Sequence, residues 1–192
     1  MQEILLIGGG GHCKSVIDVI EQENKYKIVG IIDKKELIGT KVFGYEIIAS
    51  DDELQPLSQQ YHNVCITVGQ IKSPKIRVKL FELCKSYGFS FPVVVSPRAY
   101  VSQYAQISEG TIIMHDAMVN AGTSIGKSCI INSRALVEHD CEISDNCHIS
   151  TGVILNGGVK VESNCFVGSG AVTKEGIVIY ENSFIKAGSV VK

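Results

Sequence analysis

The sequence predicts an α/β domain over residues 1–96, followed by an all-β parallel β-helix over residues 97–192. Two observations carry this prediction. Strand and helix patterns alternate over the first 95 residues, whereas from Val101 onward an aliphatic residue recurs at every sixth position. All four prolines also fall within the first 97 residues. The change of period therefore marks a domain boundary.

The first part of the chain has the pattern of a βαβ unit. Residues 3–7 form an apolar run that ends in four glycines, and residues 12–22 carry apolar side chains at helical spacing. Residues 27–32 form a β-branched run that ends at Asp33. We therefore expect a strand, a helix and a second strand in this order.

The pattern continues up to residue 95. Ser50 and Glu53 form a capping box that predicts a second helix, and residues 64–68 predict a third strand. Ser73 and Pro74 predict the start of a third helix that ends near Tyr87. The expected domain is thus a half-Rossmann-like βαβαβ unit with about three strands.

The glycine run is a candidate anion site. Gly8 to Gly11 stand between the first predicted strand and helix, where backbone N–H groups can bind a phosphate or pyrophosphate. The dinucleotide fingerprint G-x-G-x-x-G is incomplete, because Cys13 occupies the position of the third glycine, while Asp33 is spaced to contact a ribose or base. The half-size domain favours a mononucleotide over NAD. A tight turn that only joins strand to helix explains the same glycines.

The second part repeats every six residues. Of the sixteen positions from Val101 to Val191 at this spacing, fifteen are Ile, Val or Leu. The residue two before each aliphatic is small or aliphatic, and the residue three after it is Gly, Asn or Asp at twelve of fifteen positions. Gly, Asn and Asp tolerate the left-handed backbone of a turn. Each hexad is therefore predicted to be a short strand and a corner, as in a hexapeptide parallel β-helix.

The cysteines of this part are predicted to pack inside the β-helix. Cys129, Cys141, Cys147 and Cys165 all occupy the small inward position of a hexad. A metal site that combines Cys141 and Cys147 with outward histidines is disfavoured, because inward and outward side chains cannot share one tetrahedral ion. We expect thiols in the core and no metal.

Composition excludes several classes of partner. Eighteen Lys and Arg against twenty Asp and Glu give a formal net charge of -2, which disfavours nucleic-acid and anionic-membrane binding. The N-terminal MQEILLIGGGGH has too few apolar residues for a signal peptide or membrane span. The seven cysteines contain no CxxC pair and predict free thiols. We expect a cytoplasmic protein.

Four segments carry a specific resemblance. They are IGGGGH at residues 7–12, IID at 31–33, VGQ at 68–70 with Arg77, and NSRALVEHD at 132–140. Together they resemble the bacterial sugar acetyltransferases of surface-glycan synthesis, which include sialic acid O-acetyltransferase-like proteins and UDP-amino-sugar N-acetyltransferases of the bacillosamine pathway. The resemblance covers nearly the whole chain. It implies a left-handed β-helix with three hexads per triangular coil.

The same resemblance implies roles for individual residues. It assigns catalysis to His139 as general base, Asp140 as its orienting carboxylate, His148 as a second active-site histidine and Gly157 as an N–H donor to the thioester carbonyl. It implies that the acceptor's nucleotide is bound by Gly8, Gly10, Gly11, His12, Asp33, Gly69 and Gln70. It implies that acetyl-CoA is bound by Asn132, Gly157, Gly168 and Ser169. It further implies a homotrimer with the active site between subunits.

The chemistry suits these residue types, although a second pair competes. Acetyl transfer from a thioester needs a base of near-neutral pKa and an N–H donor aimed at the oxyanion, and a histidine beside a carboxylate provides the base. His115 and Asp116 have the same hexad phase as His139 and Asp140. Only the flanking segment that matches the family favours His139.

One departure and four alternatives remain open. The family usually continues into a Gly-x-Pro-Ala-Lys type segment near the CoA channel, whereas this chain reads SVVK at residues 189–192, which puts the distal CoA contacts in question. A catalytically inactive β-helix that binds nucleotide sugars or serves as a scaffold is one alternative, and transfer of a different acyl group is another. The acceptor atom, an amine or a hydroxyl, is also open, as is a free rather than nucleotide-linked sugar.

Overall fold

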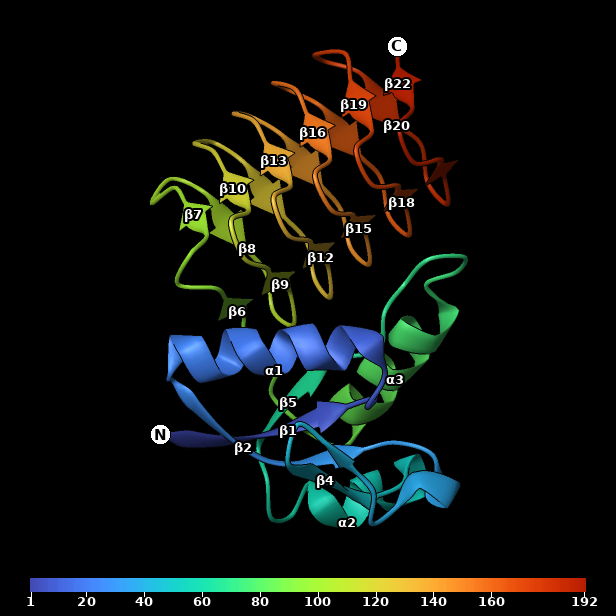
Figure 1. Cartoon of the computed structure of the whole chain (residues 1–192). Helices are drawn as coiled ribbons and strands as arrows, with labels where there is room; N and C mark the ends of the chain where they lie inside the picture. Colours follow the sequence, from blue (N-terminus) through green and yellow to red (C-terminus); the bar gives the residue numbers. More distant parts are fainter. The chain divides into compact units, whose positions relative to one another are not determined.

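The computed structural model describes all 192 residues and consists of an α/β part and a β-helix (Figure 1). The chain forms two compact units, one of Met1–Gly69 with Lys75–Pro92 and one of Gln70–Pro74 with Val93–Lys192. A short segment ahead of the third helix therefore belongs to the β-helix unit. No helix is both long and apolar enough to span a membrane. The assignment of separate functions to residues 1–96 and 97–192 stays a prediction.

The α/β unit contains a five-stranded sheet in the order β3-β4-β2-β1-β5. Its elements are β1 (Gln2–Ile7), α1 (Gly11–Glu23), β2 (Tyr26–Ile32), the 3-10 turn η1 (Lys35–Leu37), β3 (Lys41–Val42), β4 (Tyr45–Ala49), the 3-10 turn η2 (Asp51–Glu53), α2 (Leu54–Leu57), β5 (Asn63–Ile66) and α3 (Lys75–Ser86). Neighbours among β4, β2, β1 and β5 pair in parallel, and β3 pairs antiparallel with β4. The four parallel strands, in the order β4-β2-β1-β5, correspond to the first four strands of the Rossmann order 3-2-1-4-5-6.

The expected βαβαβ elements are present, but the count of about three strands was too low. The hairpin β3–β4 was missed for two physical reasons. A two-residue strand has no period to detect. The turn is Phe43–Gly44, with φ of 49° and 90°, and a phenylalanine in the left-handed position hides the Asn-Gly signal of such turns.

Local sequence explains the helices of this unit. The helix α1 buries Val16, Ile17, Val19 and Ile20 on one face. The predicted capping box is present, since the Ser50 N–H donates to Glu53 Oε2 at 2.9 Å. The capped turn leads into α2 as expected.

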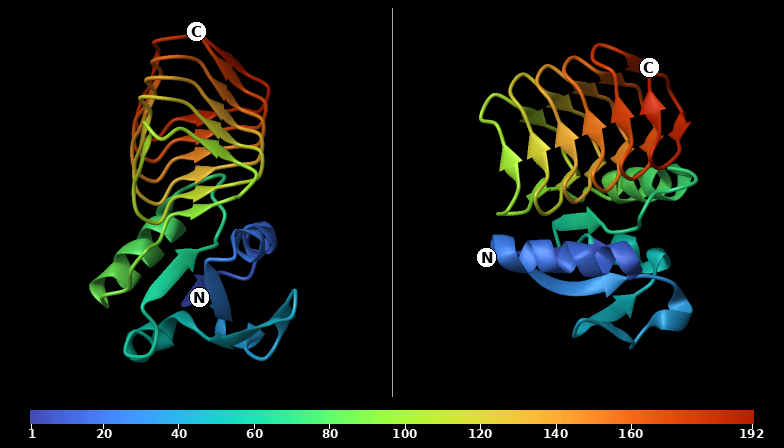
Figure 2. Two further views of the ribbon diagram at one scale, coloured as in Figure 1. Left: turned by 90° about the vertical axis from the view of Figure 1, so that its left-hand side faces the viewer. Right: turned by 45° about the horizontal axis from the view of Figure 1, so that its top comes forward.

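The β-helix consists of seventeen two-residue strands in three parallel sheets (Figure 2). The β7 sheet comprises β7 (Tyr100–Val101), β10 (Met118–Val119), β13 (Leu136–Val137), β16 (Ile154–Leu155), β19 (Val172–Thr173) and β22 (Val190–Val191). The β8 sheet comprises β8 (Gln106–Ile107), β11 (Ser124–Ile125), β14 (Glu142–Ile143), β17 (Lys160–Val161) and β20 (Val178–Ile179). The β9 sheet comprises β6 (Val94–Val95), β9 (Ile112–Ile113), β12 (Ile130–Ile131), β15 (His148–Ile149), β18 (Phe166–Val167) and β21 (Phe184–Ile185).

The predicted left-handed β-helix is thus confirmed, and one further strand, β6, precedes the hexads from Val101. Paired residues in successive coils are 18 apart, as in Val119 with Val137. The three sheets form the faces of a prism, and the turns form its three edges. We call these edges β7/β8, β8/β9 and β9/β7 after the sheets that they join.

The corners carry the expected left-handed backbone. Every sixth residue from Gly110 to Gly188 has a positive φ. These include Ser128 and Arg134, which the Gly, Asn and Asp pattern did not cover, and also Asp140, with a φ of 59°. The repeat therefore imposes this conformation even on residues that favour it less.

The inward cysteines lie in the core of the prism as predicted. Cys129, Cys141, Cys147 and Cys165 are fully buried, and the structure contains no disulfide. Each thiol donates to a carbonyl 15 residues further on, for example from Cys165 Sγ to the Tyr180 oxygen at 3.1 Å. No group of three or more His, Cys, Asp or Glu side chains is arranged as a metal site.

Candidate active site

His139 and Asp140 form a hydrogen-bonded dyad at the β7/β8 edge, in the turn between β13 and β14. His139 Nδ1 and Asp140 Oδ2 are 2.8 Å apart, and 66% of the His139 side chain is exposed. The hydrogen bond and negative charge of Asp140 raise the pKa of His139, and Glu138 adds a smaller charge effect in the same direction. With its Nδ1 hydrogen held by Asp140, the imidazole presents Nε2 as a base.

Glu138, the residue before the dyad, is fixed from the preceding coil. Asn120 lies one coil earlier, and its Nδ2 donates to Glu138 Oε2 at 2.7 Å. Asn120 was not predicted as a site residue, although a residue 18 positions earlier lies beneath its partner in such a coil.

Gly157 lies beside the imidazole from the following coil. A Cβ at residue 157 would come within 2.8 Å of both Cε1 and Nε2 of His139. Only a glycine leaves this space open. The Gly157 N–H donates to no group of the chain, while the Gly158 N–H donates to the His139 carbonyl at 2.9 Å. The site therefore combines a base with a nearby unused N–H donor, as acyl transfer requires.

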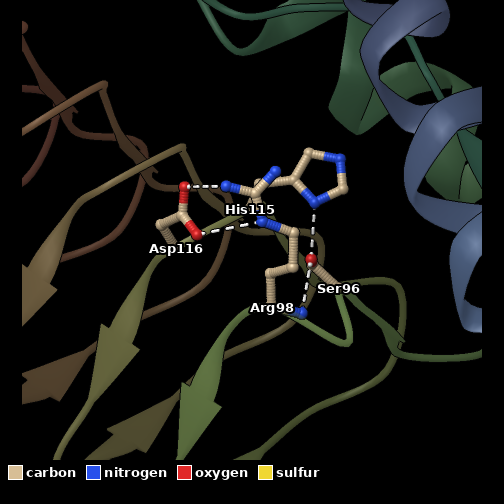
Figure 3. A network of polar contacts seen from close by, with 4 residues as sticks. All are labelled: Ser96, Arg98, His115 and Asp116. Carbon is tan, nitrogen blue, oxygen red and sulfur yellow. Dashed lines mark hydrogen bonds and ion pairs between the residues drawn. The ribbon is translucent and has the colours of Figure 1, made fainter.

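The competing pair His115 and Asp116 is arranged differently (Figure 3). Asp116 binds Arg98 through both carboxylate oxygens, at 3.1 Å to Nε and 2.8 Å to Nη2. His115 Nδ1 instead pairs with Ser96 Oγ at 2.6 Å. This pair lies in the turn between β9 and β10, at the β9/β7 edge. Here the carboxylate binds an arginine and the imidazole Nδ1 binds a serine hydroxyl, so this pair does not repeat the Nδ1–carboxylate contact of His139 and Asp140.

His148 is not brought next to the dyad. It lies in β15 on the outer side of the β9 sheet and is only 6% exposed. Its Nε2 is 3.0 Å from Asn132 Nδ2, and its Nδ1 hydrogen-bonds the Gln70 carbonyl. Gln70 is itself 1% exposed. The structure therefore brings together three residues to which the resemblance gave separate roles.

The remaining expected acetyl-CoA residues lie at another edge than the dyad. Gly168 and Ser169 follow β18, and Asn132 follows β12, so all three occupy the β9/β7 edge. A Cβ at Gly168 would meet the Ala187 nitrogen at 2.6 Å, which explains the glycine by close packing of coils. Ser169 Oγ pairs with Ser150 Oγ at 2.9 Å. Within one chain, only Gly157 of the four expected acetyl-CoA residues lies beside His139.

The expected nucleotide residues of the α/β unit converge at the carboxyl ends of β1, β2 and β5. The Gly9 N–H donates to Asp33 Oδ2 at 2.6 Å, and the Lys34 N–H donates to Asp33 Oδ1 at 2.7 Å. Gly8 has a φ of 103°, and a Cβ at this position would lie 2.4 Å from Val68 Cγ2, so the glycine cannot be replaced without strain. The Asp33 carboxylate thus fixes the start of the glycine loop.

The second half of this loop is open. No atom lies within 4 Å of a Cβ built at Gly10 or Gly11, and no side chain caps the first turn of α1 or places an acidic group there. A Cβ at Gly69 would lie 3.6 Å from His12 Cβ. The loop, His12 and Gly69 thus surround an uncapped helix start that is suited to an anion.

Comparisons with known proteins agree with this geometry. Residues 3–83 match the PglD N-terminal domain family, and residues 158–192 match the hexapeptide repeat of succinyl-transferase. The acetyltransferase domain of PglB from Neisseria gonorrhoeae FA1090 superimposes with a TM-score of 0.92 at 29% identity, covering 100% of this chain and 92% of that chain. Its complex with acetyl coenzyme A gives a TM-score of 0.90 at 28% identity, with 99% and 92% covered.

Two further solved structures are similar. A mutant of perosamine N-acetyltransferase from Caulobacter crescentus, in complex with CoA and GDP-perosamine, gives a TM-score of 0.71 at 25% identity, covering 99% of this chain and 93% of that chain. WeeI from Acinetobacter baumannii AYE shares the fold, with a TM-score of 0.78 at 24% identity and 100% and 97% covered. No curated protein sequence matches.

The hexapeptide-repeat β-helix and the structural matches to acetyltransferases define an acyltransferase of the hexapeptide-repeat class. The α/β domain and the full-length structural matches narrow this class further. The chain is an acetyl-CoA-dependent sugar acetyltransferase with hexapeptide repeats, similar over its full length to the acetyltransferase domain of PglB and to perosamine N-acetyltransferase.

Proposed function

We propose that this enzyme transfers the acetyl group of acetyl-CoA to the amine of a nucleotide-linked amino sugar in bacterial surface-glycan biosynthesis. The observation that carries the proposal is the His139–Asp140 dyad with Gly157 beside its imidazole. The structural relatives include an acetyltransferase domain bound to acetyl-CoA and an N-acetyltransferase bound to CoA and GDP-perosamine.

The mechanism follows from the three groups at the β7/β8 edge. His139 Nε2 takes a proton from the acceptor amine as its nitrogen attacks the thioester carbonyl. Asp140 stabilises the imidazolium that forms, and the Gly157 N–H donates to the oxyanion. The C–N bond forms, the C–S bond breaks, and the thiolate of CoA receives the proton from His139.

The α/β unit is proposed to bind the nucleotide part of the acceptor. The open helix start at Gly10 and Gly11 suits a phosphate, and His12 and Gly69 border it. Asp33 uses both carboxylate oxygens to accept backbone N–H groups, so its contribution is to hold Gly9 in place. Lone pairs remain on these oxygens for a ribose hydroxyl.

The division of expected acetyl-CoA residues between two edges supports a homotrimer. Gly157 lies with His139 at the β7/β8 edge, whereas Asn132, Gly168 and Ser169 lie at the β9/β7 edge, and the β7 sheet separates the two edges. If three chains turn their β7 sheets toward a common threefold axis, the β7/β8 edge of one chain meets the β9/β7 edge of its neighbour. Each acetyl-CoA would then lie between two subunits.

The outer face of the β7 sheet supports the same arrangement. Its outward side chains are apolar in every coil, namely Tyr100, Met118, Leu136, Ile154, Val172 and Val190. The β8 sheet has polar outward residues such as Ser124, Glu142 and Lys160 at the matching positions. An apolar face of this extent is typical of a surface that a partner covers.

A cytoplasmic location fits the proposed substrates and the cysteines. All seven cysteines are buried free thiols, as expected in a reducing compartment. Acetyl-CoA and nucleotide sugars are made and used in the cytoplasm.

The experiment is a release assay for CoA with acetyl-CoA and a panel of acceptors: UDP- and GDP-linked 4-amino sugars, CMP-sialic acids and free nonulosonic acids. A thiol reagent can detect the product directly, because no cysteine of the folded protein is exposed. Release with an amino sugar that depends on His139 is expected. Release only with hydroxyl acceptors would make the enzyme an O-acetyltransferase, and succinyl- or formyl-donors test the other acyl groups. Binding of nucleotide sugar without turnover on any donor would indicate a scaffold protein.

A further inference from the structure

The imidazole of His148 is enclosed by hydrogen bonds that fix its protonation. Nδ1 bonds the main-chain carbonyl oxygen of Gln70, which can only accept, so Nδ1 carries a hydrogen. Nε2 lies 3.0 Å from Asn132 Nδ2. Phe166 packs edge-on against the ring, with centroids 5.2 Å apart.

The orientation of Asn132 determines the role of Nε2. Asn132 Oδ1 accepts the Ser133 N–H at 2.8 Å, so the amide NH2 faces the imidazole. An NH2 group only donates, and Nε2 must therefore accept. The pattern assigns His148 as the neutral imidazole with its hydrogen on Nδ1. A proton on Nε2 would place two donors against each other.

Gln70 is held firmly enough to serve as the anchor. Its side-chain Nε2 donates to the carbonyls of Asn146 at 2.9 Å and Cys165 at 3.4 Å, in two successive coils. At 1% exposure the side chain does not reach a ligand in this conformation. Its other amide atom, Oε1, is buried without a hydrogen-bond partner. Burying an unpaired polar atom is unfavourable, which indicates that the fold requires the Gln70 side chain in this position.

We propose that His148 is a positioning residue: held by Gln70, it orients the amide of Asn132 toward acetyl-CoA and does not itself transfer a proton. This inference rests on the proposed function only in taking Asn132 as an acetyl-CoA contact. Asn132 is half-buried and keeps one amide hydrogen and one Oδ1 lone pair for a ligand. His148 therefore acts through Asn132, and His139 remains the one base of the site.

The protonation state can be tested without any activity. In protein labelled with 15N-histidine, the imidazole signals at neutral pH distinguish the two neutral tautomers from imidazolium, and His148→Gln identifies the signal among the five histidines. The neutral form with hydrogen on Nδ1 is expected. A neutral form with hydrogen on Nε2, or an imidazolium, would overturn the assignment even if the enzyme is fully active.

Steady-state kinetics separate positioning from proton transfer. In His148→Gln the side-chain oxygen can still accept from Asn132, and turnover within about tenfold of wild type is expected. In His148→Asn the amide can still donate to Gln70 but does not reach Asn132, and the KM for acetyl-CoA should rise about tenfold while the pH profile of kcat is unchanged. A loss of more than about 100-fold in kcat for His148→Gln, with acetyl-CoA binding intact, would make His148 a proton-transfer group.

A double-mutant cycle with Asn132→Ala completes the test. If His148 acts through Asn132, His148→Asn has no additional effect on acetyl-CoA affinity once Asn132 is removed. Additive effects would refute the proposal. Should acetyl-CoA fail to bind the wild-type protein, the proposed function fails, while the NMR result still decides whether His148 is held as described.

Discussion

The carboxylate of Asp140 lies directly against the Cα of Gly122, one coil earlier at the same edge of the prism. A Cβ at residue 122 would come within 2.4 Å of Asp140 Oδ1. The dyad is therefore bordered by two glycines, with Gly122 beside the carboxylate and Gly157 beside the imidazole. Space on both sides is part of the geometry of the base.

Gly122→Ala should lower kcat, because the new methyl group displaces the Asp140 carboxylate and with it the imidazole. Gly176→Ala is the matched control, since Gly176 lies at the same edge with a similar φ of 65° and no atom within 4 Å of its Cβ position. Both variants should lose about 1–2 kcal/mol of stability to backbone strain. Thermal melting and kcat are measured together. Equal kcat in the two variants would show that the Gly122 contact is irrelevant to catalysis.

His139→Ala should reduce turnover by about 10²- to 10⁴-fold, the usual loss when a general base is removed. Acetyl-CoA binding should survive, because the imidazole acts on the acceptor. His115→Ala should leave kcat near the wild-type value, since its carboxylate neighbour is bound to Arg98. If His115→Ala loses activity while His139→Ala stays active, the catalytic site has been assigned to the wrong edge.

The pH profile should depend on Asp140. The base must be unprotonated to act, and the carboxylate raises the pKa of His139, so kcat/KM should rise with pH through a pKa above the ordinary histidine value. Asp140→Asn removes the charge, and the rise should move to lower pH while the plateau rate falls. Rates over pH 5–9 measure both changes. A profile that does not move would contradict the pairing.

Met118→Glu should break the trimer. Met118 lies on the apolar face of the β7 sheet with 43% of its surface exposed, and a buried charge there would lack a partner. Light scattering should give about three times 20.8 kDa for the wild type and a smaller mass for the variant. Ser124→Glu, on the β8 sheet, should remain trimeric. A wild-type monomer at micromolar concentration would refute the shared site.

Gly10→Val should abolish binding of the nucleotide sugar without unfolding the protein. Gly10 has φ and ψ of -74° and -167°, which valine adopts, and its Cβ position is open, so only a ligand should meet the new side chain. Titration calorimetry with UDP- and GDP-sugars and with NAD measures the effect. Tight NAD binding by the wild type, without a response to nucleotide sugars, would overturn the mononucleotide proposal.

The repeat made the β-helix predictable, because a six-residue period fixes strands, corners and inward positions together. The period also predicts a corner at positions such as Arg134, where the residue type alone does not indicate a turn. The hairpin β3–β4 escaped prediction because a two-residue strand and a Phe43–Gly44 turn carry no periodicity and no recognised turn signal. Short edge strands are defined by their pairing in the folded sheet.

The candidate site was predictable only in part. The sequence that flanks His139 favoured it over His115, but the difference between the two pairs, in which Arg98 binds the Asp116 carboxylate, is visible only in the structure. Asn120 and Gly122 were missed, since their importance comes from lying one coil from Glu138 and Asp140. The burial of His148 was also unpredictable, because a strand position that faces outward is here covered by Gln70, which is 78 residues away in sequence.

The five residues Gln70–Pro74 have a consequence for how such enzymes can be recombined. They pack with the β-helix unit although the chain on both sides of them belongs to the α/β unit. A chimera with a single crossover near residue 93 would therefore combine the β-helix of one protein with residues 70–74 of another. The Nδ1 of His148 would then face the main-chain carbonyl of a residue from a different protein. Exchange of α/β units between relatives should give folded protein when residues 70–74 come from the same protein as the β-helix. It should fail more often when they do not.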